Sequence, residues 1–152
     1  MRVSKYIELD YGHTLSQHYG FCNQIHGHRG KVVAIVEGEI QTENGSSQGM
    51  VLDFKFLKQS LMEKVHDILD HGFAVWKEDK DDLEYIKKRN NKYIITDEPP
   101  TAEYLAKWAY HQVVGDIPKN MKLVEIQWYE TPTSVAYYSI DDYLKINERK
   151  VR

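Results

Sequence analysis

Strand-like segments stand at both ends of this chain, and the segments between them are helical or highly charged. Residues 2–11 alternate polar and apolar side chains, and residues 28–40 are rich in β-branched side chains. Both patterns are typical of strands. Residues 122–130 and 134–140 flank the sequence Thr-Pro-Thr and predict a hairpin of two further strands.

Two amphipathic helices are expected in the middle of the chain. Asp53 is a candidate N-cap, and it precedes apolar residues spaced three and four apart over 54–69. Thr101 is a second candidate N-cap, before an apolar face that Gly115 and Pro118 end. Because the helices are separate from the hairpin strands, we expect an α+β fold. It would have a four-stranded antiparallel sheet with two helices on one face, in the order ββααββ.

Charged residues dominate the stretch between the two helices. Residues 77–92 are expected to form a solvated loop or a short surface helix, and residues 92–96 a short strand.

The chain has 152 residues, 41% of them hydrophobic, which predicts one globular domain over 1–152. An open four-stranded sheet leaves edges that can pair with other copies, so a ring-shaped homo-oligomer is expected.

Composition excludes several classes of partner and compartment. The net charge is −3, whereas nucleic acids and anionic membranes require a basic face. The single cysteine, Cys22, cannot form an internal disulfide, which fits a reducing compartment. The first residues lack the apolar region of a signal peptide, and no stretch approaches the length of a membrane helix. We therefore expect a cytoplasmic protein.

Three histidines are placed where strands can bring them together. His26 and His28 flank Gly27 at the start of the second strand, and residues i and i+2 of a strand project to the same face. His13 ends the first strand, which would be its neighbour in the sheet. Three imidazoles suit zinc and leave a fourth coordination position open, as in catalytic zinc sites. Three other histidines are expected to be ordinary surface or core residues, namely His18, His66 and His111.

Two further features carry possible chemistry. Cys22 lies four residues before His26, and a thiol near a divalent cation is more readily deprotonated. A small buried hydrophobe is the alternative for such a cysteine. Asp70 and His71 follow the first helix, and a carboxylate can fix the tautomer of a neighbouring imidazole. A histidine that complements the helix dipole is the alternative there.

Several short motifs occur in a specific order along nearly the whole chain. They are YGHTL around His13, Cys22-x3-HGH, GMVLDF at 49–54, LDH at 69–71, PTAEYLA at 100–106 and WYET at 128–131. Together they resemble the 6-pyruvoyl tetrahydropterin synthase family, and most closely its bacterial 6-carboxytetrahydropterin synthase branch in queuosine (7-deazaguanine) biosynthesis. The chain differs from the usual family pattern at Gly12, Arg29 and Tyr104.

The resemblance implies a role for each matching residue. His13, His26 and His28 would bind the zinc ion. Cys22 would be the catalytic base, and Asp70 with His71 the dyad that supplies or relays a proton. Glu130 would bind the pterin, because a carboxylate can accept two hydrogen bonds from the planar edge formed by the 2-amino and N3–H groups. Thr101 and Glu103 are weaker candidates for contacts with the substrate.

The resemblance also implies a tunnelling fold, a homohexamer built from two trimers and active sites between subunits. The implied reaction is that of a zinc-dependent lyase, which converts 7,8-dihydroneopterin triphosphate to 6-carboxy-5,6,7,8-tetrahydropterin with release of acetaldehyde and triphosphate. Three alternatives stay open at this stage. One is a 6-pyruvoyl tetrahydropterin synthase, another is a metal-free thiol hydrolase that uses Cys22 and His71, and the last is a non-enzymatic protein that binds zinc and pterin.

Overall fold

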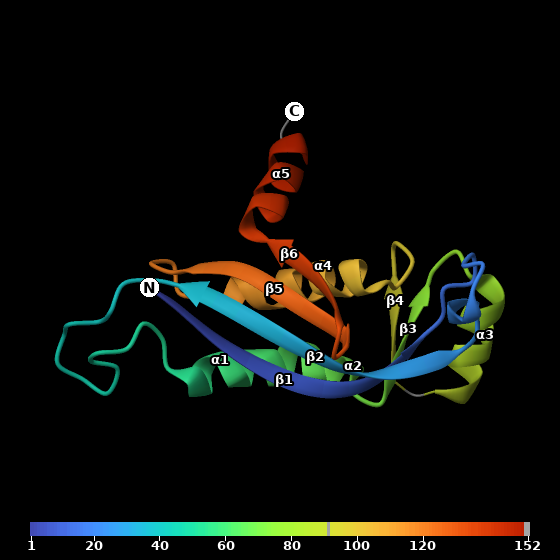
Figure 1. Cartoon of the computed structure of the whole chain (residues 1–152), viewed down its shortest axis with the longest axis horizontal. Coiled ribbons are helices and arrows are strands. Elements are labelled where there is room, and N and C mark those ends of the chain that lie inside the picture. Colours follow the sequence, from blue (N-terminus) through green and yellow to red (C-terminus); the bar gives the residue numbers. More distant parts are fainter. Residues whose placement is uncertain (91, 151–152) are drawn as a thin grey trace.

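A curled six-stranded sheet forms the centre of the fold (Figure 1). The computed structural model describes residues 1–90 and 92–150, with side chains up to residue 146. The strands are β1 (Arg2–His13), β2 (His26–Glu37), β3 (Gly72–Trp76), β4 (Tyr93–Thr96), β5 (Lys122–Thr131) and β6 (Ser134–Ser139). Their spatial order is β4-β3-β1-β2-β5-β6.

The α+β class is confirmed, but the expected four-stranded antiparallel sheet is wrong. The antiparallel strands β1, β2, β5 and β6 are present, and β3 and β4 extend the sheet beyond β1 in parallel. Strand β3 was missed because four of its five residues are buried, so it shows none of the alternation that marks a half-exposed strand. The short strand β4 falls within the expected range 92–96.

The chain also forms helices and shorter helical turns. They are η1 (Phe21–Asn23), α1 (Phe54–Leu61), the π-helical turn η2 (Met62–His66), α2 (Asp67–Leu69), α3 (Lys80–Arg89), α4 (Ala102–Val113), η3 (Val114–Asp116) and α5 (Ile140–Lys150). Both expected N-caps are confirmed, because Asp53 accepts from the N–H of Lys55 and Thr101 from that of Tyr104. The predicted helix over 54–69 is divided by the π-helical turn.

The structure has two helices, α3 and α5, in addition to the two amphipathic helices that the sequence predicted. The charged stretch contains α3, which confirms the surface-helix alternative for 77–92, although position 91 lies outside the described residues. Helix α5 follows β6 and projects from the body of the molecule (Figure 1). Within the described residues, no helix is both long enough and apolar enough to span a membrane.

The core lies between the inner face of the sheet and helices α1 and α4. Alternate residues of β1 and β2 are buried on this face, and the strand pairing places Leu9 opposite Gly30 and Ile7 opposite Val32. Trp128 of β5 is fully buried. The same inner face continues to the ends of β1 and β2, where polar side chains replace apolar ones.

Candidate active site

The pairing of β1 with β2 brings the three histidines together. His13 is the partner of His26, and Tyr11 is the partner of His28. All of these residues therefore project to the inner face of the sheet. Gly27 permits this close pairing, because a Cβ atom there would lie 2.8 Å from the Tyr11 carbonyl oxygen.

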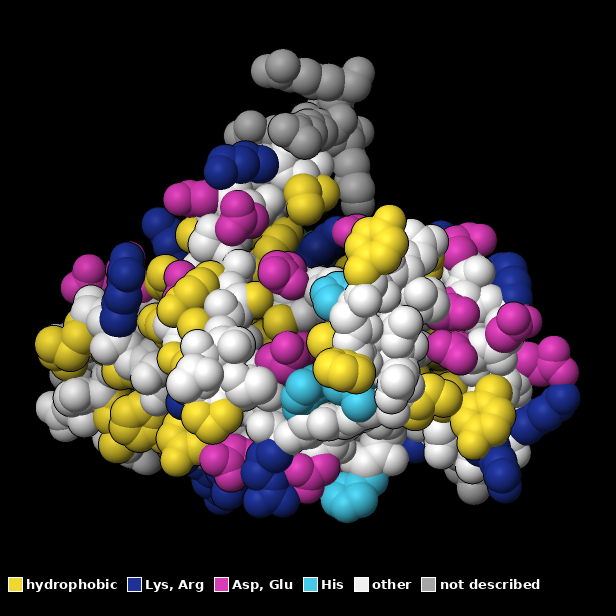
Figure 2. All heavy atoms as spheres, turned by 45° about the vertical axis from the view of Figure 1, so that its right-hand side comes forward, with side chains coloured by type: hydrophobic (Ala, Val, Ile, Leu, Met, Phe, Trp, Pro, Cys, Tyr) yellow, Lys and Arg dark blue, Asp and Glu magenta, His cyan; other side chains and the backbone are white. Residues whose placement is uncertain are grey.

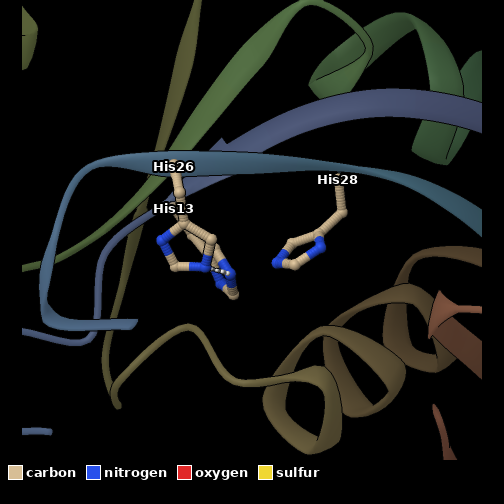
Figure 3. Close-up of side chains that lie close together, drawn as sticks. All are labelled: His13, His26 and His28. Atoms are coloured by element: carbon tan, nitrogen blue, oxygen red, sulfur yellow. Dashed lines mark hydrogen bonds between the residues drawn. The ribbon is translucent and has the colours of Figure 1, made fainter. Parts of the chain in front are cut away.

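The imidazole rings face one another across a short gap (Figure 3). Their ring centroids are 4.5 Å apart for His13 and His26, 5.1 Å for His13 and His28, and 4.9 Å for His26 and His28. One nitrogen from each ring lies within 4.8 Å of the others. The sequence-predicted group is thus brought together, and it could hold a metal ion.

Backbone carbonyl groups fix the tautomers of two of these rings. Nδ1 of His13 lies 2.7 Å from the Pro100 carbonyl oxygen, and Nδ1 of His26 lies 2.7 Å from that of Gln24. A carbonyl oxygen only accepts, so each Nδ1 carries the proton and each neutral ring presents a lone pair at Nε2. Metal-binding histidines are commonly oriented in this way.

The unprotonated atoms of this pair are placed so that they can share a cation. His13 Nε2 and His26 Nε2 lie 3.0 Å apart, with no proton between them when both rings are neutral. In a tetrahedral site with Zn–N distances of about 2.0–2.1 Å, the ligand nitrogens lie about 3.3 Å apart. In addition, His28 Nε2 is buried and lacks a hydrogen-bond partner among the described residues. The donor set therefore fits a zinc ion.

Burial favours the metal-binding form of the histidines. Burial lowers the pKa of His13, a fully buried residue, and outweighs the opposing hydrogen bond to Pro100. Burial likewise lowers the pKa of His28 against the attraction of Glu130. Because a metal binds the neutral imidazole, both shifts keep the ligands available below the ordinary histidine pKa.

Glu130 lies beside the imidazoles. Its Oε1 atom is 3.6 Å from His13 Nε2 and 3.8 Å from His28 Nε2. In Figure 2 adjoining histidine side chains on this face have an acidic side chain next to them. A cavity of about 500 Å³ is lined by Glu130 together with His28, Arg29 and Lys31. His28, one of the candidate metal ligands, and the candidate pterin-binding carboxylate of Glu130 therefore line the same cavity.

Asp70 and His71 form a hydrogen-bonded pair at the end of α2. Asp70 Oδ2 lies 2.7 Å from His71 Nδ1, and Asp70 Oδ1 accepts from the Asp10 N–H at 2.8 Å. Burial raises the pKa of Asp70, but these hydrogen bonds outweigh it and the pKa lies below its ordinary value. The carboxylate is therefore charged, and it orients an imidazole that is 80% exposed.

His71 adopts a backbone conformation that is uncommon for a residue with a side chain. Its φ of 57° lies in the left-handed region, and its N–H donates to the Asp10 carbonyl oxygen at 2.6 Å. This geometry ends α2 and sends the chain into β3. His71 and His28 line a cavity of about 410 Å³, so one residue of this pair and one of the three histidines share a common space.

The remaining residues that the sequence predicted for the site are Cys22, Thr101 and Glu103. Cys22 lies in η1 and is partly exposed, and the candidate ligand group among the described residues does not include it. The Cys22 carbonyl oxygen accepts from the Leu15 N–H, which closes the loop between β1 and β2. Thr101 caps α4 next to Pro100, and Glu103 lies in the first turn of that helix.

Sequence reasoning missed the two carbonyl groups that orient the histidines. Gln24 and Pro100 act through backbone oxygen atoms, which no side-chain pattern reveals. It also missed Tyr11, whose hydroxyl accepts from Trp128 Nε1 at 3.0 Å and whose ring packs on His13 and His28. The alternation of β1 marks Tyr11 as buried but not as a neighbour of the histidines.

The fold and these positions can be compared with known proteins. The family described as 6-pyruvoyl tetrahydropterin synthase matches residues 2–141. The chain belongs to this family. Helix α5 lies almost wholly beyond the residues matched to the 6-pyruvoyl tetrahydropterin synthase family.

Relatives within the 6-pyruvoyl tetrahydropterin synthase family cover most of the chain. A 6-carboxy-5,6,7,8-tetrahydropterin synthase from Haemophilus influenzae is 28% identical, over 90% of this chain and 97% of its own length. One from Synechocystis is 31% identical, over 90% and 91%. A putative 6-carboxy-5,6,7,8-tetrahydropterin synthase from Pyrococcus horikoshii is 33% identical, over 85% and 83%.

Solved structures share the fold at lower sequence identity. An uncharacterised protein from Wolinella succinogenes matches with a TM-score of 0.71 at 23% identity, over 92% of this chain and 98% of that one. The 6-pyruvoyl tetrahydropterin synthase of Caenorhabditis elegans matches with a TM-score of 0.66 at 22% identity, over 91% and 94%. These likenesses concern the fold alone.

Proposed function

We propose that this protein is a zinc-dependent lyase that acts on 7,8-dihydroneopterin triphosphate. The products are 6-carboxy-5,6,7,8-tetrahydropterin, acetaldehyde and triphosphate, with one water consumed, as a step of queuosine biosynthesis. The observation that carries the proposal is the convergence of His13, His26 and His28, with two Nε2 lone pairs 3.0 Å apart. The names of the relatives from Haemophilus influenzae and Synechocystis support the carboxy product.

The three histidines would hold the zinc ion, which when bound supplies a Lewis acid and leaves one coordination position for substrate. The protein's own groups then move the protons. Cys22, as the thiolate, takes a proton from the substrate side chain. His71, oriented by Asp70 at 2.7 Å, supplies or relays a proton on the other face.

The remaining candidates bind the substrate. Glu130 would accept two hydrogen bonds from the edge of the pterin, and its position beside His28 would keep the side chain of the substrate near the histidines. Thr101 and Glu103 line a second cavity of about 540 Å³ at the start of α4. We place them as further substrate contacts, with Thr101 acting from its capping position.

We further propose that the active site is completed in a homohexamer of two trimers. Residues 2–10 of β1 have no strand pairing on the side away from β2 among the described residues, and β6 is an edge strand. Open edges of this kind favour pairing with other copies. A site between subunits would also explain why Cys22 is absent from the histidine group within one chain.

Product identification tests this function. The protein is incubated with dihydroneopterin triphosphate, with and without a chelator, and pterins and acetaldehyde are quantified. We expect 6-carboxytetrahydropterin and equimolar acetaldehyde only when the metal is present. Cys22→Ala should abolish turnover and keep the metal, whereas full turnover in this variant would refute the role of the thiolate.

One alternative has support of its own. The matching family and the structure from Caenorhabditis elegans carry the name 6-pyruvoyl tetrahydropterin synthase, which suggests an enzyme that eliminates triphosphate and retains the three-carbon side chain. The same assay distinguishes the two reactions. A 6-pyruvoyl product without acetaldehyde would establish the alternative, and metal and pterin binding without any product would establish a non-enzymatic protein.

A further inference from the structure

Strands β2 and β5 pair along most of their length but part at one end. The last pair of their ladder is Lys31 with Tyr129, and residues 26–30 of β2 have no partner in β5 among the described residues. The cavity of about 500 Å³ lies at this end, and the last pair lines it together with His28 and Glu130. Lys31 and a candidate metal ligand therefore share one cavity.

Lys31 is held by aromatic rings instead of a carboxylate. Its Nζ atom lies 3.8 Å from the ring centroid of Tyr129 and 5.8 Å from that of Tyr6. The faces of such rings attract a cation, so they fix the direction of the side chain without neutralising its charge. Lys31 is partly buried and forms no ion pair with any described residue. Its ammonium group can therefore accept an anionic partner.

The same cavity also contains one guanidinium group and two carboxylates, which belong to Arg29, Glu8 and Glu130. Arg29 donates two hydrogen bonds to Asp10, at 2.9 and 2.8 Å, so its charge is already balanced. Glu130 lies beside the histidines. Glu8 is exposed, and although it is opposite Lys31 in the register of β1 and β2, the two side chains form no ion pair. Lys31 is therefore the cation of this cavity that remains available to an anion.

We propose that Lys31 binds the phosphate groups of the substrate and so selects phosphorylated over unphosphorylated pterins. A phosphate chain carries several negative charges, and lysine binds phosphate as a point charge that needs no fixed geometry. The shared cavity would place these phosphates next to His28 and Glu130, which the proposed function assigns to the metal and the pterin. The identity of the anion rests on the proposed function, whereas the anion site rests on the position and the unbalanced charge of Lys31.

Binding of inorganic triphosphate tests the anion site without any need for turnover. Calorimetry measures its Kd for the full chain as purified, and metal analysis of the same samples shows whether triphosphate removes the metal. Lys31→Met removes the charge and keeps an unbranched side chain, and Lys31→Arg keeps the charge. Lys58→Met is the matched control, because Lys58 is an exposed lysine on α1.

We expect Lys31→Met to raise the Kd for triphosphate by about 10-fold or more, because a charge-assisted hydrogen bond is lost. Lys31→Arg should retain binding, and Lys58→Met should equal the wild type. In turnover, Lys31→Met should raise KM for dihydroneopterin triphosphate and change kcat little. The Kd for unphosphorylated dihydroneopterin should not change, which a purely structural role of Lys31 would not explain.

Two results would overturn this inference. One is a triphosphate Kd that is the same in the wild type and in Lys31→Met, and the other is an equal loss of affinity in Lys31→Met and Lys58→Met. If triphosphate binding depends on Lys31 but no lyase product forms, the proposed function has failed and the anion site stands. If product forms with the same KM in the wild type and in Lys31→Met, the proposed function stands and the role of Lys31 has failed.

Discussion

The Nε2 atoms of His13 and His26 lie 3.0 Å apart, although both rings already donate from Nδ1 to backbone carbonyl oxygens. Two neutral rings in these tautomers turn lone pairs toward each other, an arrangement that a shared cation stabilises. The antiparallel register of β1 and β2 imposes this approach. The sheet itself therefore builds the candidate metal site, and loops contribute only the carbonyl groups that orient it.

Acidification should destabilise the metal-free protein. Burial lowers the pKa of His13 and His28 below the ordinary value of 6.5, so the unfolded chain binds more protons than the folded protein. Stability is therefore complete above pH 6.5 and falls as the pH drops below that value. Urea unfolding of chelator-treated protein at pH 7.5 and 5.5 measures this effect. The variant His28→Gln should lose less stability on acidification, and an equal loss in both proteins would assign the effect to other groups.

Removing the hydroxyl of Tyr11 should weaken the fold next to the histidines. Tyr11→Phe leaves Trp128 Nε1 buried without its acceptor, which costs about 1–3 kcal/mol of unfolding free energy. Tyr6→Phe provides a control on the same strand, because that side chain is 56% exposed. Denaturant titrations should show a lower midpoint for Tyr11→Phe alone. Equal midpoints for the two variants would mean that the Tyr11 hydroxyl contributes nothing to stability.

Much of this arrangement follows from the sequence, and the exceptions have physical causes. The i and i+2 spacing of His26 and His28 places both rings on one face, and the strand ending at His13 supplies the third. Neither β3 nor helix α5 was expected. Strand β3 is buried on both faces, so its residues do not alternate between polar and apolar. Helix α5 is a polar segment whose partly buried side chains Tyr143 and Ile146 pack against the core.

A single sequence does not show which segments that are far apart in the chain lie close together in the fold. Nothing in the motif PTAEYLA indicates that the Pro100 carbonyl oxygen accepts a hydrogen bond from His13, 87 positions earlier. Likewise, Gly12 differs from the usual family residue, and the structure gives the reason. A Cβ atom there would lie 2.5 Å from the Phe73 ring, which belongs to a strand that the pattern of the sequence did not reveal.

Loss of the Glu130 charge should weaken pterin binding and leave metal binding intact. A hydrogen bond to a charged acceptor contributes about 1.5–3 kcal/mol, so Glu130→Gln should raise the pterin Kd by about 10- to 100-fold. Fluorescence titration with a dihydropterin measures the Kd, and metal analysis of the same samples is the control. An unchanged Kd would remove Glu130 from the pterin-binding site. Loss of the metal would instead identify it as a ligand.

Asp70 and His71 should act as one unit in catalysis. Asp70→Asn leaves a side chain of the same shape but removes the charge that pairs with His71 Nδ1, so kcat should fall by about 10²-fold or more. His71→Ala should produce a similar fall. The double variant should be no slower than the slower single variant, because coupled groups are not additive. Multiplicative losses would show that the two residues act independently.

The histidine site is tested most directly by X-ray absorption of the zinc-loaded protein, together with its metal content. We expect one zinc ion per chain with three nitrogen ligands at about 2.0–2.1 Å. His28→Ala should lower the zinc content, whereas the control His18→Ala, at an exposed loop position, should leave it unchanged. Protein that binds no stoichiometric zinc, or that retains the same zinc coordination after loss of His28, would show that the three histidines do not form a zinc site.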